Sequence, residues 1–146
     1  MNVDRARVAF LGLDHPHSLA IHLTLLSVPG IERIVVVEPN RSLWDRAPAS
    51  ACYPGLNDLF AFESPHICFV MQPTDLAADF SLQCLGRGCH VFLDKPGTNS
   101  AQSMDHLVRV AEARGVQLAI GYLWRNHGVT QVIRDILSQG GVPTRT

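Results

Sequence analysis

The stretch that decides the fold reads Val8-Ala9-Phe10-Leu11-Gly12-Leu13-Asp14-His15-Pro16-His17-Ser18. Apolar residues of strand length end at Gly12, a few polar residues follow, and an apolar-periodic segment begins at Leu19. This order predicts a strand, a tight turn and a helix. The first N–H groups of a helix have no partner within it, so this turn could receive a phosphate.

The glycine pattern of the turn is incomplete. The dinucleotide-binding pattern G-x-G-x-x-G has its first glycine at Gly12, but Asp14 and His17 occupy the other two glycine positions. Both side chains would crowd the loop, and Asp14 adds negative charge where a phosphate would lie. We interpret the stretch as a pyrophosphate loop, and the residues expected around the phosphates are Gly12, Leu13, Asp14, His17 and Ser18.

Composition excludes several classes of protein. The chain has 146 residues, 47% of them hydrophobic and 17% charged, which is typical of a globular protein of one domain. A formal net charge of −1 gives no general attraction for nucleic acid, and the apolar runs are too short to span a bilayer. Four cysteines without a C-x-x-C pair predict reduced core thiols in a cytoplasmic protein.

Strand-like apolar runs alternate with segments of helical periodicity along the whole chain. This alternation predicts an α/β fold, a doubly wound and mostly parallel sheet of the Rossmann type with about six strands. The expected strands are 7–12, 34–37, 51–52, 67–71, 91–93 and 116–121. The expected helices start near 16 and cover 56–60, 76–84, 104–111 and 129–137. In the first helix, we expect Leu19, Leu23 and Leu26 to form the buried stripe.

Polar residues follow the predicted strands at the edge where such sheets bind ligands. Glu38 ends the second strand and could accept both ribose hydroxyls of NAD, whereas it would repel the 2′-phosphate of NADP. Arg41 lies close by in the sequence and could pair with a 2′-phosphate, so NADP stays possible as the cofactor. Lys95 could place a cation beside a substrate hydroxyl as a hydride leaves, although a surface lysine in a turn is the alternative from local sequence alone.

Three blocks of the sequence are similar to those of a known family. They are Val8 to Gly12, the run Gly88-Cys89-His90-Val91-Phe92-Leu93-Asp94-Lys95-Pro96, and Gly121-Tyr122 through Arg125 with the amphipathic helix that ends at Gly140-Gly141. In order and spacing they resemble the N-terminal domain of the Gfo/Idh/MocA oxidoreductase family. The resemblance covers essentially the whole chain.

The resemblance implies that NAD or NADP binds over the strand ends and that the substrate is a sugar, a polyol or a related hydroxyl compound. Lys95 would be the catalytic contact with the substrate hydroxyl, and Arg125 would contact cofactor or substrate. Asp94 replaces the more usual glutamate, and Ala77 stands about where the family often has a histidine. The full set of expected cofactor contacts is Gly12, Leu13, Asp14, His17, Ser18, Glu38, Arg41, Gln72, Pro73, Asp94, Lys95 and Arg125.

Family members also carry a second α/β domain, which supplies the substrate pocket and usually the oligomer interface. We therefore expect residues 1–125 to form the dinucleotide-binding domain and 126–146 to form a linking helix at the start of a missing domain. An exposed apolar surface after Ile136 and Leu137 is expected for the same reason. On this hypothesis the chain is truncated and inactive alone, and its full-length form could be a homo-oligomer.

Two other functions stay open. One is a non-catalytic dinucleotide-binding or interaction module that keeps the fold without the chemistry. The other is a metal-dependent hydrolase, because Asp14-His15-Pro16-His17 also looks like the H-x-H of enzymes that hold Zn²⁺ with two imidazoles and a carboxylate. Against the hydrolase, His66 and His90 begin their strands, on the opposite edge of the sheet, and a hydrolase barrel needs about 250 residues. The preferred interpretation includes no metal.

Overall fold

In the computed structural model, residues 5–140 are described, and their six strands form one parallel sheet. The strands are β1 (Ala6–Leu11), β2 (Ile31–Val37), β3 (Ala51–Tyr53), β4 (Ile67–Val70), β5 (His90–Leu93) and β6 (Leu118–Ile120). Their order across the sheet is β3-β2-β1-β4-β5-β6, so the direction of winding reverses between β1 and β4. The predicted doubly wound α/β fold is confirmed.

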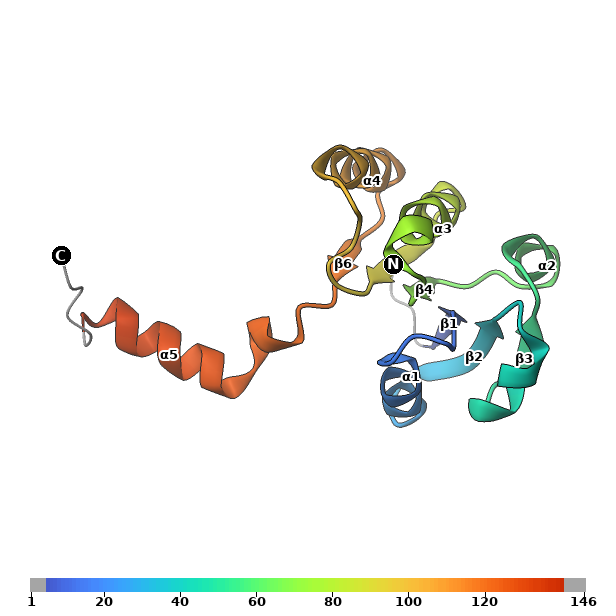
Figure 1. Cartoon of the computed structure of the whole chain (residues 1–146), viewed down its shortest axis with the longest axis horizontal. Helices are drawn as coiled ribbons and strands as arrows, with labels where there is room; N and C mark the ends of the chain where they lie inside the picture. The colour runs from blue at the N-terminus through green and yellow to red at the C-terminus, as the bar shows by residue number, and fades with distance from the viewer. Residues whose placement is uncertain (1–4, 141–146) are drawn as a thin grey trace.

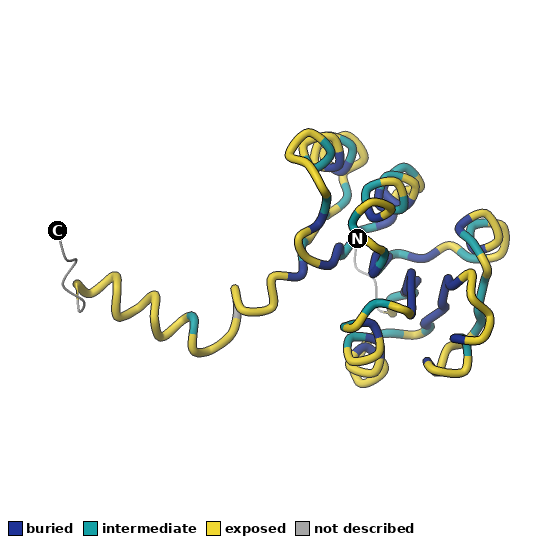
Figure 2. The backbone as a smooth tube through the Cα atoms, in the orientation of Figure 1, coloured by how far each residue is buried: buried dark blue, intermediate teal, exposed yellow. Residues whose placement is uncertain are grey.

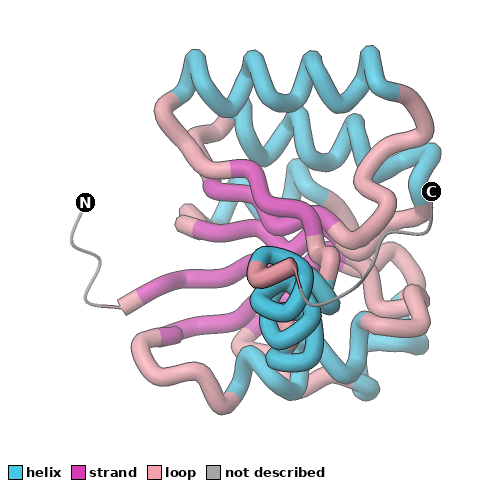
Figure 3. The backbone as a smooth tube through the Cα atoms, turned by 90° about the vertical axis from the view of Figure 1, so that its left-hand side faces the viewer, coloured by secondary structure: helices cyan, strands magenta, loops and turns pink. Residues whose placement is uncertain are grey.

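Helices cover both faces of the sheet (Figures 1 and 3). One face packs against α2 (Leu56–Phe62), α3 (Thr74–Gly86) and α4 (Ala101–Arg114), and the other against α1 (Ser18–Leu26) and the 3₁₀-helix η1 (Arg41–Arg46). Side chains alternate along each strand, which produces two cores. In β1, Ala9 and Leu11 belong to the first core, and Val8 and Phe10 belong to the second.

The buried face of α1 differs from the predicted one. Leu19, Leu23 and Leu26 are 46–48% exposed, so the expected stripe is wrong. The buried residues are instead Ser18, His22 and Leu25, which share the same helical spacing one position earlier. The leucine spacing marks the more apolar side of the helix, whereas the buried side carries two polar residues, so periodicity indicated the wrong face. The contacts of Ser18 and His22 decide the rotation of the helix.

His22 anchors α1 to the sheet. Its ring is fully buried, meets Phe10 edge-on at 5.1 Å between centroids, and places Nε2 2.7 Å from the carbonyl oxygen of Pro48. A polar ring can be buried at this position because one nitrogen has a backbone partner.

The cysteines lie where the composition suggested. All four are free thiols; Cys68, Cys84 and Cys89 are buried, and Cys52 is half-buried. Hydrogen bonds with Cys84 and Cys89, together with burial, hold the pKa of the Cys68 thiol well above its ordinary value. Cys68 is therefore a core thiol with little thiolate character.

The chain leaves the sheet through η2 (Leu123–Asn126) and α5 (Gly128–Ser138), which projects away from the rest of the molecule (Figure 1). Figure 2 shows α5 as almost wholly exposed. Its apolar side chains, which are Val129, Val132, Ile133, Ile136 and Leu137, are 45–58% exposed. The predicted exposed apolar surface is confirmed. Among the described residues, no helix combines the length and hydropathy needed to cross a membrane.

Candidate functional site

The turn after β1 requires a glycine. Gly12 has φ of +100°, a conformation that residues with a side chain rarely adopt. A Cβ at this position would lie 2.8 Å from the carbonyl oxygen of Met71 and 3.0 Å from Nε2 of Gln72. Both the backbone conformation and the available space therefore exclude a larger residue, and β1 and β4 approach closely where the sheet changes direction.

Ser18 closes this turn from the helix side. Its hydroxyl is fully buried and donates to the carbonyl oxygen of Gly12 at 2.9 Å, while its N–H donates to the carbonyl oxygen of His15. The hydroxyl of Ser18 therefore shapes the loop, and its contact with a phosphate stays a prediction.

Glu38 holds the same loop from the end of β2. Its side chain is 5% exposed, and its two oxygens accept the N–H of Leu13 at 2.8 Å and the N–H of Asn40 at 2.9 Å. An ionised carboxylate has about four acceptor positions, so each oxygen can still accept from a ribose hydroxyl. The Leu13 N–H, in contrast, is no longer free for a phosphate.

A cavity of about 310 Å³ opens at the ends of β1, β2 and β4. It brings together several residues that the sequence placed there, including Gly12, Asp14 and Glu38. The complete lining is Gly12, Asp14, His15, Pro16, Glu38, Pro39, Met71, Gln72, Pro73 and Leu76.

A second cavity of about 330 Å³ follows the ends of β5 and β6. Lys95 is exposed and lines it, together with His17, Gly121, Tyr122, Leu123 and Trp124. Gly121 lets the chain pass close to β5, because a Cβ there would lie 2.8 Å from Cζ of Phe92. The lysine expected to be catalytic therefore faces a cavity with aromatic walls.

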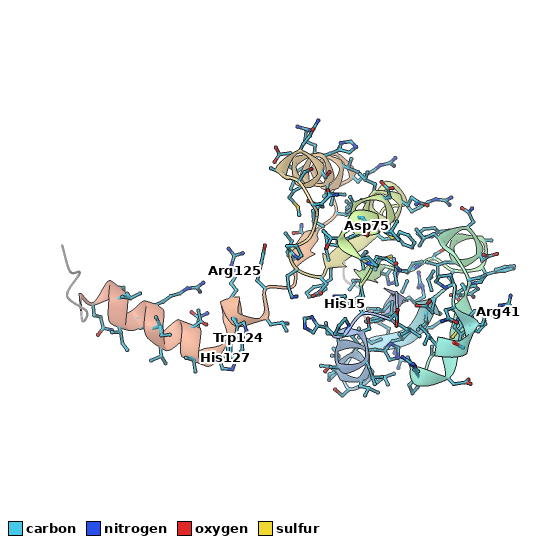
Figure 4. All side chains as sticks on the ribbon, in the orientation of Figure 1. His15, Arg41, Asp75, Trp124, Arg125 and His127 are labelled. Carbon is cyan, nitrogen blue, oxygen red and sulfur yellow. The ribbon has the colours of Figure 1, made fainter. Side chains whose placement is uncertain are left out.

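Asp94 lies beside both histidines of the loop. The carboxylate is 6% exposed, and its Oδ2 is 3.3 Å from Nε2 of His15 and 3.4 Å from Nδ1 of His17. Figure 4 labels His15 beside α1, on the loop that precedes this helix. Local sequence did not indicate this contact, because His15 and Asp94 are 79 positions apart and Asp14 is the nearer carboxylate in the motif.

Five predicted contacts line neither cavity: Leu13, Ser18, Arg41, Asp94 and Arg125. Leu13, Ser18 and Asp94 contact the glycine loop or its histidines, whereas Arg41 and Arg125 lie away from the loop. Arg41 is at the far edge of the molecule in Figure 4, where its guanidinium carbon lies 5.3 Å from the centre of the Trp44 ring. Arg125 is exposed on η2 and lines neither cavity. Local sequence could place both residues after a strand, but it could not determine the direction of their side chains.

A sequence model described as the oxidoreductase family with an NAD-binding Rossmann fold matches residues 32–122. A dTDP-3,4-didehydro-2,6-dideoxy-alpha-D-glucose 3-reductase of Streptomyces violaceoruber is 28% identical over 92 residues, which cover 63% of this chain and 27% of that protein. The scyllo-inositol 2-dehydrogenase (NADP(+)) IolW of Bacillus subtilis (strain 168) is 30% identical over 78 residues, which cover 52% of this chain and 21% of that protein. The matched part is thus about a quarter of these relatives.

The fold has a close counterpart among solved structures. The WlbA dehydrogenase from Chromobacterium violaceum, solved in complex with NADH and UDP-GlcNAcA, superposes with a TM-score of 0.84 at 19% identity. The superposition covers 95% of this chain and 41% of that one. The open parallel sheet also differs from the closed barrel that the hydrolase alternative requires. The chain belongs to the Gfo/Idh/MocA oxidoreductase family, of which it is the NAD-binding Rossmann domain.

Proposed function

We propose that this domain holds NAD along the carboxyl edge of the sheet in an enzyme that oxidises or reduces a sugar, polyol or related hydroxyl compound. The observation that carries the proposal is the placement of predicted site residues in two cavities along that edge. Glu38 lines the cavity at β1, β2 and β4, and Lys95 lines the cavity at β5 and β6. NAD, when bound, supplies the hydride chemistry.

The loop fits a dinucleotide in shape. Gly12 has no side chain to fill the space beside β4, and no side chain caps the first turn of α1. Asp14 opposes the fit, because it is exposed and adds negative charge to the same cavity. We expect a dinucleotide to bind, with an affinity that this carboxylate reduces.

Lys95 would act on the substrate. An ammonium group can donate a hydrogen bond to the substrate oxygen and stabilise the charge that develops there. Its exposure inside the second cavity supports this role, since the group reaches the cavity without being desolvated. The substrate class rests on the relatives, which include a deoxysugar reductase and an inositol dehydrogenase.

We also propose that residues 1–125 are the cofactor domain and that 126–146 connect it to a second domain. The exposed apolar face of α5 supports this division, because a helix with such a face normally packs against another element. The same face supports a homo-oligomer, which sedimentation would detect. The free, buried thiols support a cytoplasmic location.

Calorimetric titration with NADH and NADPH tests the cofactor proposal directly. We expect one site per chain and tighter binding of NADH, because the Glu38 carboxylate repels a 2′-phosphate. The absence of binding by either dinucleotide would contradict the proposal. Lys95 is also an expected cofactor contact, so the same titration with Lys95→Met should show weaker binding of NADH than the wild type. Equal affinities of the two proteins would remove Lys95 from the cofactor site.

A further inference from the structure

We propose that His15, His17 and Asp94 form a binding site for a divalent transition-metal ion such as Zn²⁺. One atom from each residue, namely His15 Nε2, His17 Nδ1 and Asp94 Oδ2, lies within 4.8 Å of the other two. Two segments far apart in the sequence supply them, the loop before α1 and the end of β5. This inference is separate from the NAD proposal and does not depend on it.

The distances match those between the ligands of a tetrahedral ion. Zn²⁺ binds imidazole nitrogen and carboxylate oxygen at about 2.0–2.2 Å, which separates neighbouring ligand atoms by about 3.4 Å. The two contacts to Asp94 Oδ2 measure 3.3 Å and 3.4 Å. The imidazoles are 23% and 39% exposed, so small ring rotations can bring their nitrogens to the same separation.

The polar atoms at this position lack the partners that buried polar atoms usually have. Asp94 Oδ2 and His17 Nδ1 are both inaccessible to solvent, and neither makes a hydrogen bond with any described residue. An unpaired buried polar atom destabilises a fold, and an unpaired buried charge does so more strongly. A cation between the three atoms would satisfy both orphaned atoms and compensate the carboxylate charge.

The set of donors selects the class of ion. Two imidazole nitrogens and one carboxylate oxygen suit zinc and other late first-row metals, whereas Mg²⁺ and Ca²⁺ prefer oxygen alone. The His17 N–H donates to Nδ1 of His15 at 3.3 Å, which orients the ring with Nε2 toward Asp94. This bond leaves the proton of the neutral ring on Nε2. Ion binding at Nε2 therefore requires the proton to move to Nδ1, and the bond from the His17 N–H is then lost.

The metal site lies where a small molecule bound in either cavity could reach the ion. His15 lines the cavity at β1, β2 and β4, and His17 lines the one at β5 and β6, so the ion would lie between them. Three protein ligands leave at least one coordination position open, as in catalytic zinc sites. An oxygen atom of a molecule bound in either cavity could occupy that position.

Titration of the chain with Co²⁺, followed by its visible absorption, and competition by Zn²⁺ test the proposal without any dinucleotide. We expect one ion per chain, with affinity reduced at least 100-fold in Asp94→Asn, His15→Ala and His17→Ala. Asp14→Asn and His106→Ala are the matched controls, because Asp14 is the exposed carboxylate of the motif and His106 is an exposed histidine of α4. Both controls should bind within twofold of the wild type.

A measurement on the wild-type chain is needed as well, because some of the variants could fail to fold. Zn²⁺ should shift the imidazole NMR signals of His15 and His17 and leave those of His66 and His90, at the opposite edge, unchanged. The proposal is overturned if no ion binds, if the shifts appear at other histidines, or if Asp14→Asn weakens binding as much as Asp94→Asn. Since NAD is absent throughout, these outcomes leave the cofactor proposal untouched.

Discussion

The Glu38 carboxylate accepts the Leu13 N–H at 2.8 Å across 25 residues of sequence. This bond ties the end of β2 to the glycine turn after β1. Glu38 also accepts the N–H of Asn40 at 2.9 Å, so one side chain holds two loops. The residue that the sequence assigns to a ligand is therefore also part of the support of the site.

Glu38→Gln should affect stability and binding together. The amide keeps one acceptor oxygen in place of two, so we expect one of the two loop bonds to be lost and the free energy of unfolding to fall by about 1–2 kcal/mol. Loss of the negative charge should narrow the preference for NADH over NADPH. Urea unfolding and calorimetry measure the two effects, and unchanged stability would show that the carboxylate does not hold the loops.

Gly12→Ala should destabilise the protein by about 3 kcal/mol, because it combines an unfavourable backbone conformation with a Cβ 2.8 Å from the Met71 oxygen. Gly86→Ala is the matched control. Gly86 ends α3 with a negative φ and has open space around its Cα, so alanine should stabilise by about 0.5 kcal/mol. Chemical denaturation measures the free energy of unfolding of both variants. Equal changes in the two would show that Gly12 is not specially required at the turn.

Asp14→Gly should tighten NADH binding, because it removes both a charge and a side chain from the cavity. Asp14→Asn removes the charge and keeps the size. If repulsion of the pyrophosphate is the larger effect, the two variants will improve binding equally, by about fivefold. If crowding by the side chain is the larger effect, only Asp14→Gly will tighten NADH binding. Weaker binding by both variants in calorimetry would mean that the loop uses this carboxylate.

The apolar face of α5 should contribute little to the stability of this chain. Ile136 is 45% exposed, and we expect Ile136→Glu to change the free energy of unfolding by less than about 0.5 kcal/mol. Leu85→Ala is the contrasting variant, since Leu85 is fully buried and its truncation should cost about 2–5 kcal/mol. A large loss in Ile136→Glu would show that α5 packs on the domain in solution.

The decrease in the free energy of unfolding at acidic pH should depend on Glu63. Its pKa is lowered from the ordinary value of 4.5, first by the hydrogen bond from Arg33 and also by that from Tyr53. A carboxyl with a lowered pKa stabilises the fold above about pH 4.5, and this contribution disappears as the pH falls through the folded pKa. Glu63→Gln should lose about 1 kcal/mol at pH 7, and the difference from wild type should shrink in unfolding curves recorded below pH 4.5. A difference that is independent of pH would contradict this assignment.

Local sequence was sufficient for the fold and for the edge of the sheet at which most predicted site residues gather. Unbroken apolar runs such as Ile34 to Val37 are typical of central parallel strands, and the residues that follow parallel strands gather at one edge. Gly12 marked the turn because no other residue tolerates its conformation there. These features depend on neighbours in the chain, so periodicity and turn chemistry reveal them.

Tertiary structure alone decided which atoms meet. The rotation of α1 follows from the hydrogen bond of Ser18 to the Gly12 carbonyl and the contact of His22 with the Pro48 carbonyl, and not from the leucine spacing. The carboxylate beside the two histidines is Asp94 rather than Asp14, since the sheet brings β5 against the loop before α1. The sequence by itself determined the strands, the turns and the edge of the sheet at which the predicted site residues gather. The packing of strands that are distant in the sequence determined which polar atoms at that edge contact one another.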